Sequence, residues 1–138
     1  MIHATAIIGD PPEHRDWKPG DPMHHPEIDE SAQVNALVTV DAGLHEPTRV
    51  GARTLLMKHV HIGHDAVIGT DCELAPGTVI GGHVTLGDSV RVGVNACVRP
   101  FINVGTGARI GAGAVVVKDV EPGAVVVGNP ARPLPPKE

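Results

Sequence analysis

Aromatic residues are almost absent from this chain of 138 residues, which contains one Trp, one Phe and no Tyr. Trp17 and Phe101 are too few to fill the core of an ordinary globular domain. Ile, Val and Leu would nevertheless suffice to line the narrow interior of a solenoid. The length fits one domain spanning residues 1–138.

The chain also lacks any long apolar run, and no basic stretch followed by an apolar one stands at its N-terminus. We therefore expect neither a membrane span nor a signal peptide. The net charge is −5, and Lys and Arg are scattered, which argues against a nucleic-acid surface. The two cysteines form no obvious pairing pattern, so we expect a reducing, cytoplasmic setting.

What the chain has instead is a six-residue repeat that runs without a gap from Val50 to Glu121. An aliphatic residue opens each of twelve hexads, and glycine takes the next place in eight of them. A period of six fits neither an amphipathic helix nor a two-faced strand, so it indicates a stacked repeat. The openers are Val50, Leu56, Ile62, Ile68, Leu74, Ile80, Leu86, Val92, Val98, Val104, Ile110 and Val116.

Three hexads close one triangular coil of 18 residues, with the openers stacked inside and the coils about 4.8 Å apart. The fourth place after the opener usually holds a small or β-branched residue, which suits a tight inward corner; Cys72 is one of them. The glycines suit backbone angles that strain other residues. Five upstream openers bring the total to 17 hexads and predict an all-β parallel β-helix of about six coils: Ile2, Ile8, Ile28, Val34 and Val40.

Two breaks interrupt the repeat. Five prolines fall within residues 10–27, and because proline cannot donate to a strand ladder, this segment is expected to be an extruded loop. Between Val40 and Val50 the register slips by four residues, which predicts a small bulge or loop. The tail, residues 122–138, is expected to cap the unpaired end of the solenoid. Four of its prolines, Pro130, Pro133, Pro135 and Pro136, make its end Pro-rich.

Four of the nine histidines fall close together in the repeat: His59, His61, His64 and His83. His64 stands two places after an opener, which puts it outside the coil. A step of 18 residues brings Gly82 beside His64 and His83 beside Asp65 on the next coil. Two imidazoles, a carboxylate and a bare glycine amide thus converge, which is the set needed for a general base, its orienting partner and an oxyanion donor.

The stretch from Leu55 to Asp65, followed in phase by Gly81-Gly82-His83-Val84, resembles the bacterial UDP-N-acetylglucosamine acyltransferase family of lipid A synthesis. Ile8-Gly9-Asp10 and Asp16-Trp17-Lys18 are similar to the sugar-contacting loop of that family, so the resemblance covers about Ile2 to Val116. It implies a left-handed β-helix, a homotrimer, and acyl transfer from a thioester to a hydroxyl or amine of an amino sugar or nucleotide sugar.

The resemblance also implies a role for each site residue. His64 is the general base, Asp65 its orienting neighbour, and Gly82 the amide that polarises the thioester carbonyl. His61 and His83 line the sugar and acyl pocket, while Asp16 and Lys18 hold the acceptor. The donor, acyl-CoA or acyl-carrier protein, is a co-substrate, so neither a tightly bound cofactor nor a metal is expected. An imidazole pKa near 6.5 suits a base at neutral pH.

The sequence departs from that family near its end. Arg99-Pro100 stands where the family has a His-Gln pair. Val117 to Val120 and Val125 to Pro133 instead resemble the ending of acetyl-CoA-dependent sugar acetyltransferases, which makes Lys118 and Arg132 candidates for contacts with CoA phosphates.

Two other classes of function stay open at this point. A non-catalytic solenoid used as a scaffold or assembly subunit has the same repeat, because fold does not determine function. Hexapeptide-repeat carbonic anhydrases bind zinc through histidines, two of them spaced five apart on one chain, but Gly69 stands five after His64. His59, His61 and His64 would have to gather a metal by another geometry.

Overall fold

The computed structural model describes residues 1–135 and is built from short strands without an α-helix in that range. Nothing in these residues folds as a long apolar helix of the kind that crosses a bilayer. In chain order the strands are β1 (Ile7–Asp10), β2 (Glu27–Ile28), β3 (Gln33–Val34), β4 (Thr39–Asp41), β5 (Arg49–Val50), β6 (Leu55–Leu56), β7 (His61–Ile62), β8 (Val67–Ile68), β9 (Glu73–Leu74), β10 (Val79–Ile80), β11 (Thr85–Leu86), β12 (Arg91–Val92), β13 (Cys97–Val98), β14 (Asn103–Val104), β15 (Arg109–Ile110), β16 (Val115–Val116), β17 (Val125–Val127) and β18 (Arg132–Pro133).

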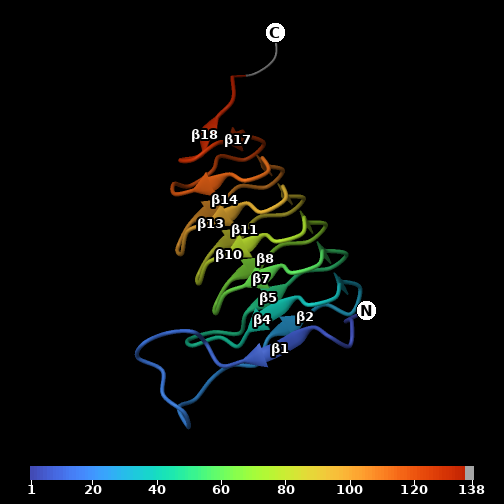
Figure 1. Cartoon of the computed structure of the whole chain (residues 1–138), viewed down its shortest axis with the longest axis vertical. Helices are drawn as coiled ribbons and strands as arrows, with labels where there is room; N and C mark the ends of the chain where they lie inside the picture. Colours follow the sequence, from blue (N-terminus) through green and yellow to red (C-terminus); the bar gives the residue numbers. More distant parts are fainter. Residues whose placement is uncertain (136–138) are drawn as a thin grey trace.

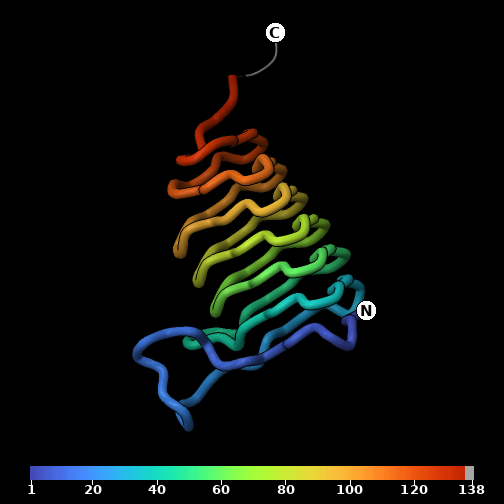
Figure 2. The backbone as a smooth tube through the Cα atoms, in the orientation of Figure 1, coloured from blue at the N-terminus to red at the C-terminus, as the bar shows by residue number. Residues whose placement is uncertain are grey.

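Successive strands fall in turn into three sheets, which form the three walls of a solenoid. The first sheet has the order β1-β4-β7-β10-β13-β16, the second β14-β11-β8-β5-β2, and the third β18-β17-β15-β12-β9-β6-β3. Neighbours pair in parallel, as where His61 lies opposite Val79, and only β17 and β18 pair antiparallel among the described strands. Figures 1 and 2 show the coils stacked along the long axis, which confirms the predicted parallel β-helix.

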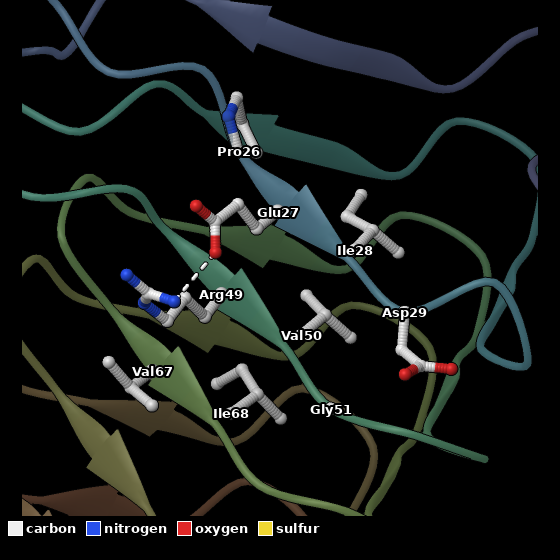
Figure 3. A pocket seen from close by; sticks show the side chains of 9 residues that line it. All are labelled: Pro26, Glu27, Ile28, Asp29, Arg49, Val50, Gly51, Val67 and Ile68. Carbon is white, nitrogen blue, oxygen red and sulfur yellow. Dashed lines mark hydrogen bonds and ion pairs between the residues drawn. The ribbon is translucent and has the colours of Figure 1, made fainter.

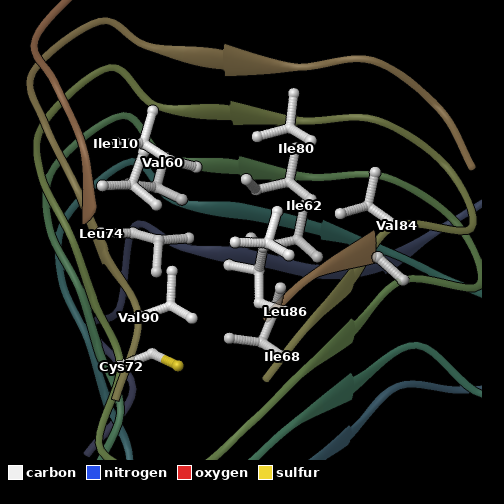
Figure 4. Close-up of a cluster of buried hydrophobic side chains, with 14 of the residues drawn as sticks. Val60, Ile62, Ile68, Cys72, Leu74, Ile80, Val84, Leu86, Val90 and Ile110 are labelled. Carbon is white, nitrogen blue, oxygen red and sulfur yellow. The ribbon is translucent and has the colours of Figure 1, made fainter. Parts of the chain in front are cut away.

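The openers of the hexads form the core. Leu56, Ile62, Leu74 and Ile80 are fully buried, and Figure 4 shows such side chains meeting inside the coils. The small residues at the fourth place are buried too, Cys72 included, so the predicted inward corners are confirmed.

The physical reason proposed for the glycines was wrong. None of the eight glycines that follow an opener has a positive φ. A Cβ at these places would instead strike the next coil; on Gly51 it would lie 2.5 Å from the carbonyl oxygen of Gly69. The left-handed backbone falls two places later, where non-glycine residues such as Asp65 (φ 61°) and His83 (φ 59°) adopt it.

Both predicted breaks in the repeat are loops, and they dock on each other. The Pro-rich segment joins β1 to β2 and projects from the stack (Figure 1, blue), as expected for residues 10–27. The second loop joins β4 to β5. The N–H of His24 donates to the carbonyl of Gly43 (2.9 Å), and the N–H of Gly43 donates back to His24 (2.8 Å).

The first part of the tail packs on the last coils, where β17 pairs in parallel with β15. β17 and β18 form an antiparallel pair, and the N–H of Ala131 donates to the carbonyl of Val115 at 2.8 Å. Ala124 and Ala131 pack against the core. Pro136, the last of the prolines assigned to the cap, lies outside the described residues.

Candidate active site

The centre of the candidate site is a buried carboxylate held by the loop between β4 and β5. Asp65 Oδ1 accepts hydrogen bonds from the N–H groups of His45 (2.7 Å) and Glu46 (2.7 Å), and Oδ2 accepts one from Leu44 (2.8 Å). The N–H of Asp65 itself donates to Thr48 Oγ1 at 3.0 Å. The side chain is only 2% exposed, so these bonds fix the carboxylate rigidly.

Burial by itself would raise the pKa of Asp65. The hydrogen bond to His64 and the three backbone N–H donors outweigh that effect and hold the pKa well below its usual range. Asp65 is therefore a carboxylate at any pH at which the protein would work.

His64 is oriented by this carboxylate. Its Nδ1 lies 2.7 Å from Asp65 Oδ2, so in the neutral ring we assign the hydrogen to Nδ1 and the free lone pair to Nε2. A Cβ built on Gly82 would lie 2.7 Å from that Nε2, which means that the ring occupies the space a side chain would need. The N–H of Gly82 makes no hydrogen bond within residues 1–135. The predicted meeting of His64, Asp65 and Gly82 is confirmed as geometry.

His83 lies beside this group on the next coil. Its Nε2 is 3.6 Å from Asp65 Oδ2, its ring packs edge-on against His64 (5.2 Å between centroids), and it stacks flat on Phe101 (4.6 Å, 7°). Burial lowers its pKa, and the nearby histidines act in the same direction against the attraction of Asp65. With His45, Glu46 and Asp65 it lines a cavity of about 310 Å³.

The Pro-rich loop covers the other side of His64. His14 packs edge-on against the His64 ring at 5.6 Å between centroids. His14 and Asp16 line a cavity of about 510 Å³ together with Leu44 and His45. Asp16 therefore lies on the wall of a cavity next to His64. Lys18 is exposed and does not line this cavity; its backbone N–H donates to Asp21 (2.8 Å).

A second imidazole–carboxylate pair lies on the outer face of the first sheet. His61 Nδ1 is 2.6 Å from Thr39 Oγ1, and His61 Nε2 lies 3.8 Å from Asp41 Oδ2. Asp41 is 5% exposed at its side chain. Burial raises its pKa to about 6, although the charges of His61 and His64 oppose that shift.

Sequence reasoning missed Asp41, His14, His45 and the amides of residues 44–46. Asp41 alone left a signal, since a carboxylate stands where most hexads have glycine directly after the opener. The others lie in the two loops, to which counting along the repeat does not extend.

The metal alternative is not favoured by this arrangement. Within residues 1–135, His59, His61 and His64 do not gather their ring nitrogens; His45, Asp65 and His83 are the group that brings ligand atoms within 4.8 Å of one another. The two oxygens of Asp65 already accept four hydrogen bonds, which use their four lone-pair sites.

Lys118 and Arg132 lie away from this cluster but close to each other. Both line a cavity of about 220 Å³ at the C-terminal end of the solenoid, with Asp119 and Glu121 among the other lining residues. Lys118 stands on the same corner of the coil as His64, three steps of 18 residues later. At about 4.8 Å a coil, this separates them by about 14 Å along the stack.

A larger cavity, of about 640 Å³, lies over β2, β5 and β8 (Figure 3). Glu27 and Arg49 pair there at 2.6 Å, and none of the predicted site residues lines it. The histidine-rich corner is therefore the candidate site despite its smaller cavities.

Comparison with known proteins supports both the fold and the family. The model of the bacterial transferase hexapeptide (six repeats) matches residues 47–82. The acyl-[acyl-carrier-protein]–UDP-N-acetylglucosamine O-acyltransferase of Nautilia profundicola is 30% identical over 139 residues, covering 95% of this chain and 51% of that protein. The UDP-3-O-acylglucosamine N-acyltransferase of Caulobacter sp. is 33% identical over 138 residues, covering 96% and 41%.

The crystal structure of UDP-N-acetylglucosamine O-acyltransferase from Moraxella catarrhalis superposes with a TM-score of 0.90 at 29% identity, covering 96% of this chain and 52% of that one. The chain thus spans about half the length of the relatives that it matches. The superposition confirms the left-handed form of the β-helix. The unbroken hexads, the three-walled solenoid and these matches show that the chain belongs to the hexapeptide-repeat family.

Proposed function

We propose that this protein is an acyltransferase that moves an acyl group from a thioester to a hydroxyl or amine of an amino sugar or nucleotide sugar. The observation that carries the proposal is the position of His64: Nδ1 is bound to Asp65 at 2.7 Å, while Nε2 lies over Gly82. A histidine held in this way has the free lone pair and the fixed orientation that a general base needs.

In the proposed reaction His64 Nε2 takes a proton from the acceptor as its oxygen or nitrogen attacks the thioester carbonyl carbon. The N–H of Gly82 donates to the carbonyl oxygen while that oxygen carries negative charge. The carbon–sulfur bond then breaks, and the protonated His64 gives its proton to the leaving thiolate. The products are an ester or amide and a free thiol. Asp65 stays ionised and stabilises the imidazolium.

The acceptor is proposed to bind between the corner of the coil and the Pro-rich loop. Asp16 lines the cavity on that side, and His83 packs edge-on against His64 from the next coil. His61, on the strand that precedes His64, is assigned to the wall of the same pocket. Lys18, on the same exposed loop, is the cation we assign to an anionic part of the acceptor.

The donor is proposed to run along the corner from Gly82 toward the C-terminal end. Acyl-CoA and acyl-carrier protein share a pantetheine arm with the thioester at one end and a phosphate at the other. Lys118 and Arg132, which line one cavity, are the cations proposed for that phosphate. Both donors are co-substrates, so no tightly bound cofactor is needed. The free thiols of Cys72 and Cys97 fit the reducing cytoplasm in which such donors occur.

We also propose a homotrimer that completes the site. The outer face of the first sheet presents a row of mostly apolar residues beside the candidate site. The row is Ile7, Thr39, His61, Val79, Cys97 and Val115. Val79 is 44% exposed in the single chain. Sedimentation should give three times the 14.3 kDa of one chain, and Val79→Glu should give the mass of one.

A thiol-release assay tests the reaction itself. Acyl-CoA and acyl-carrier-protein donors of several chain lengths would be combined with UDP-amino sugars. We expect His64→Ala to lower the rate by about 10² to 10⁴. His59→Ala is the matched control, because His59 is an exposed corner histidine that lines neither cavity beside His64. Equal thiol release by the wild type and His64→Ala with every pair would leave a non-catalytic scaffold as the better account.

A further inference from the structure

Asp41 is a nearly buried carboxylate that the proposed reaction does not use. Its side chain is 5% exposed, and it makes no side-chain hydrogen bond within residues 1–135. The nearest imidazole, His61, is held at Nδ1 by the hydroxyl of Thr39 (2.6 Å), and its Nε2 stays 3.8 Å from Asp41. That separation is too long for a hydrogen bond, so within these residues His61 is an ion-pair neighbour of Asp41 and the carboxylate has no hydrogen-bond partner.

The surroundings of Asp41 favour a cation. Asp10 is its register partner on β1, and the carboxylates of Asp10 and Glu13 both raise its pKa. The imidazoles of His61 and His64 act in the opposite direction and lower the pKa of Asp41. A buried carboxylate among other carboxylates is stabilised by a bound positive charge or a strong hydrogen-bond donor.

The number of protons in the reaction distinguishes the two acceptor classes. A hydroxyl loses one proton when it is acylated, and one base suffices. An amine is an ammonium ion near neutral pH, so it must lose one proton before it attacks and a second as the amide forms. The site has two imidazole–carboxylate pairs, His64 with Asp65 and His61 with Asp41.

We propose that Asp41, beside His61, binds the acceptor as an ammonium group and takes its first proton, so that the acceptor is an amine rather than a hydroxyl. The proton passes from nitrogen to the Asp41–His61 pair and on to water. The neutral amine then attacks the thioester, and His64 takes the second proton and delivers it to the thiolate. Ammonium and thioester thus give amide, thiol and one released proton. This inference rests on the acyl transfer proposed above and names its substrate class.

Matched acceptors test it. The probes are UDP-glucose and its analogues with one hydroxyl replaced by an amine at carbon 2, 3 or 4, UDP-glucosamine among them. We expect kcat/KM for the best amine to exceed that of UDP-glucose at least tenfold. Asp41→Asn should raise KM for that amine about tenfold and leave the use of hydroxyl acceptors unchanged. Glu30→Gln, which alters an exposed carboxylate that lines none of the cavities described above, is the control and should change neither markedly.

Each outcome decides between the claims. The inference is overturned if UDP-glucose is acylated as fast as the amines. It is also overturned if Asp41→Asn lowers kcat/KM equally for amine and hydroxyl acceptors. Either result leaves the proposed acyl transfer standing. Absence of thiol release with every probe and donor overturns the acyl transfer and this inference with it. Circular dichroism of Asp41→Asn shows whether a loss of activity comes from unfolding. A normal KM for the amine in Asp41→Glu would support the claim that the negative charge at this position binds the acceptor.

Discussion

The imidazole of His64 lies directly over Gly82, so close that a Cβ on the glycine would come within 2.7 Å of Nε2. Gly82 is therefore required for space and not for backbone conformation, since its φ is not positive. The same contact brings the backbone of Gly82, whose N–H makes no hydrogen bond within residues 1–135, close to the imidazole that is proposed to move the proton.

Gly82→Ala should accordingly damage catalysis more than folding. The new methyl group must push the His64 ring off the glycine and away from the oxyanion position, so we expect kcat/KM to fall by about 10² to 10³. Thiol release measures the rate, and thermal melting measures the fold. Gly113→Ala is the control, since a Cβ there meets nothing within 4 Å although φ is +68°. It should lower Tm slightly and leave the rate unchanged. A Gly82→Ala enzyme within threefold of the wild type would contradict the assigned contact.

Asp65→Asn should weaken the fold at neutral pH and much less in acid. The folded pKa of Asp65 is below its unfolded value of about 3.9, so its stabilisation is present above that pH and is lost as the pH falls through the folded value. The amide would also turn an NH₂ toward backbone donors, at a cost of about 1–3 kcal/mol. Urea unfolding of both proteins between pH 3 and 7 measures the difference, which should shrink below pH 4. A constant difference across that range would argue against the lowered pKa.

Asp41→Asn should have the opposite sign. The folded pKa of about 6 is above the unfolded value of about 3.9, so the folded protein binds more protons between them. The stability of the wild type therefore falls as the pH rises from about 4 to about 6 and stays low above that. We expect the variant to be more stable than the wild type at pH 7 by about 1–3 kcal/mol and equal near pH 4. Urea unfolding measures this, with Glu30→Gln, which alters an exposed carboxylate, as the control. A variant that is less stable than the wild type at pH 7 would refute the prediction.

The hexad repeat alone predicted much of this molecule. A period of six determines which side chains face inward, and a step of 18 residues along the sequence predicts that Gly82 lies beside His64 and His83 beside Asp65. Such counting works because each coil hydrogen-bonds to the next in fixed register, as where Val79 lies opposite His61.

The same counting could not find the loop side of the site. Leu44, His45 and Glu46 bind Asp65 through backbone N–H groups, which any residue except proline supplies, so their identity contains no signal. His14 reaches His64 because the two loops dock between His24 and Gly43, a contact between irregular segments. The glycines were misread because a short distance between coils and a left-handed φ favour the same residue.

The flat stack of His83 on Phe101 gives a last test of the site's electrostatics. Burial is the main cause of the lowered pKa of His83, and Phe101 covers one face of that ring although it is itself 71% exposed. Phe101→Ala should admit water to the imidazole and raise its pKa toward 6.5, because solvation favours the charged form. An NMR titration of the histidine Cε1 protons measures the shift. Val94→Ala, which removes another exposed apolar side chain, should leave His83 unchanged. A pKa that stays constant or falls in Phe101→Ala would mean that Asp65 and the neighbouring histidines, and not the aromatic cover, control this residue.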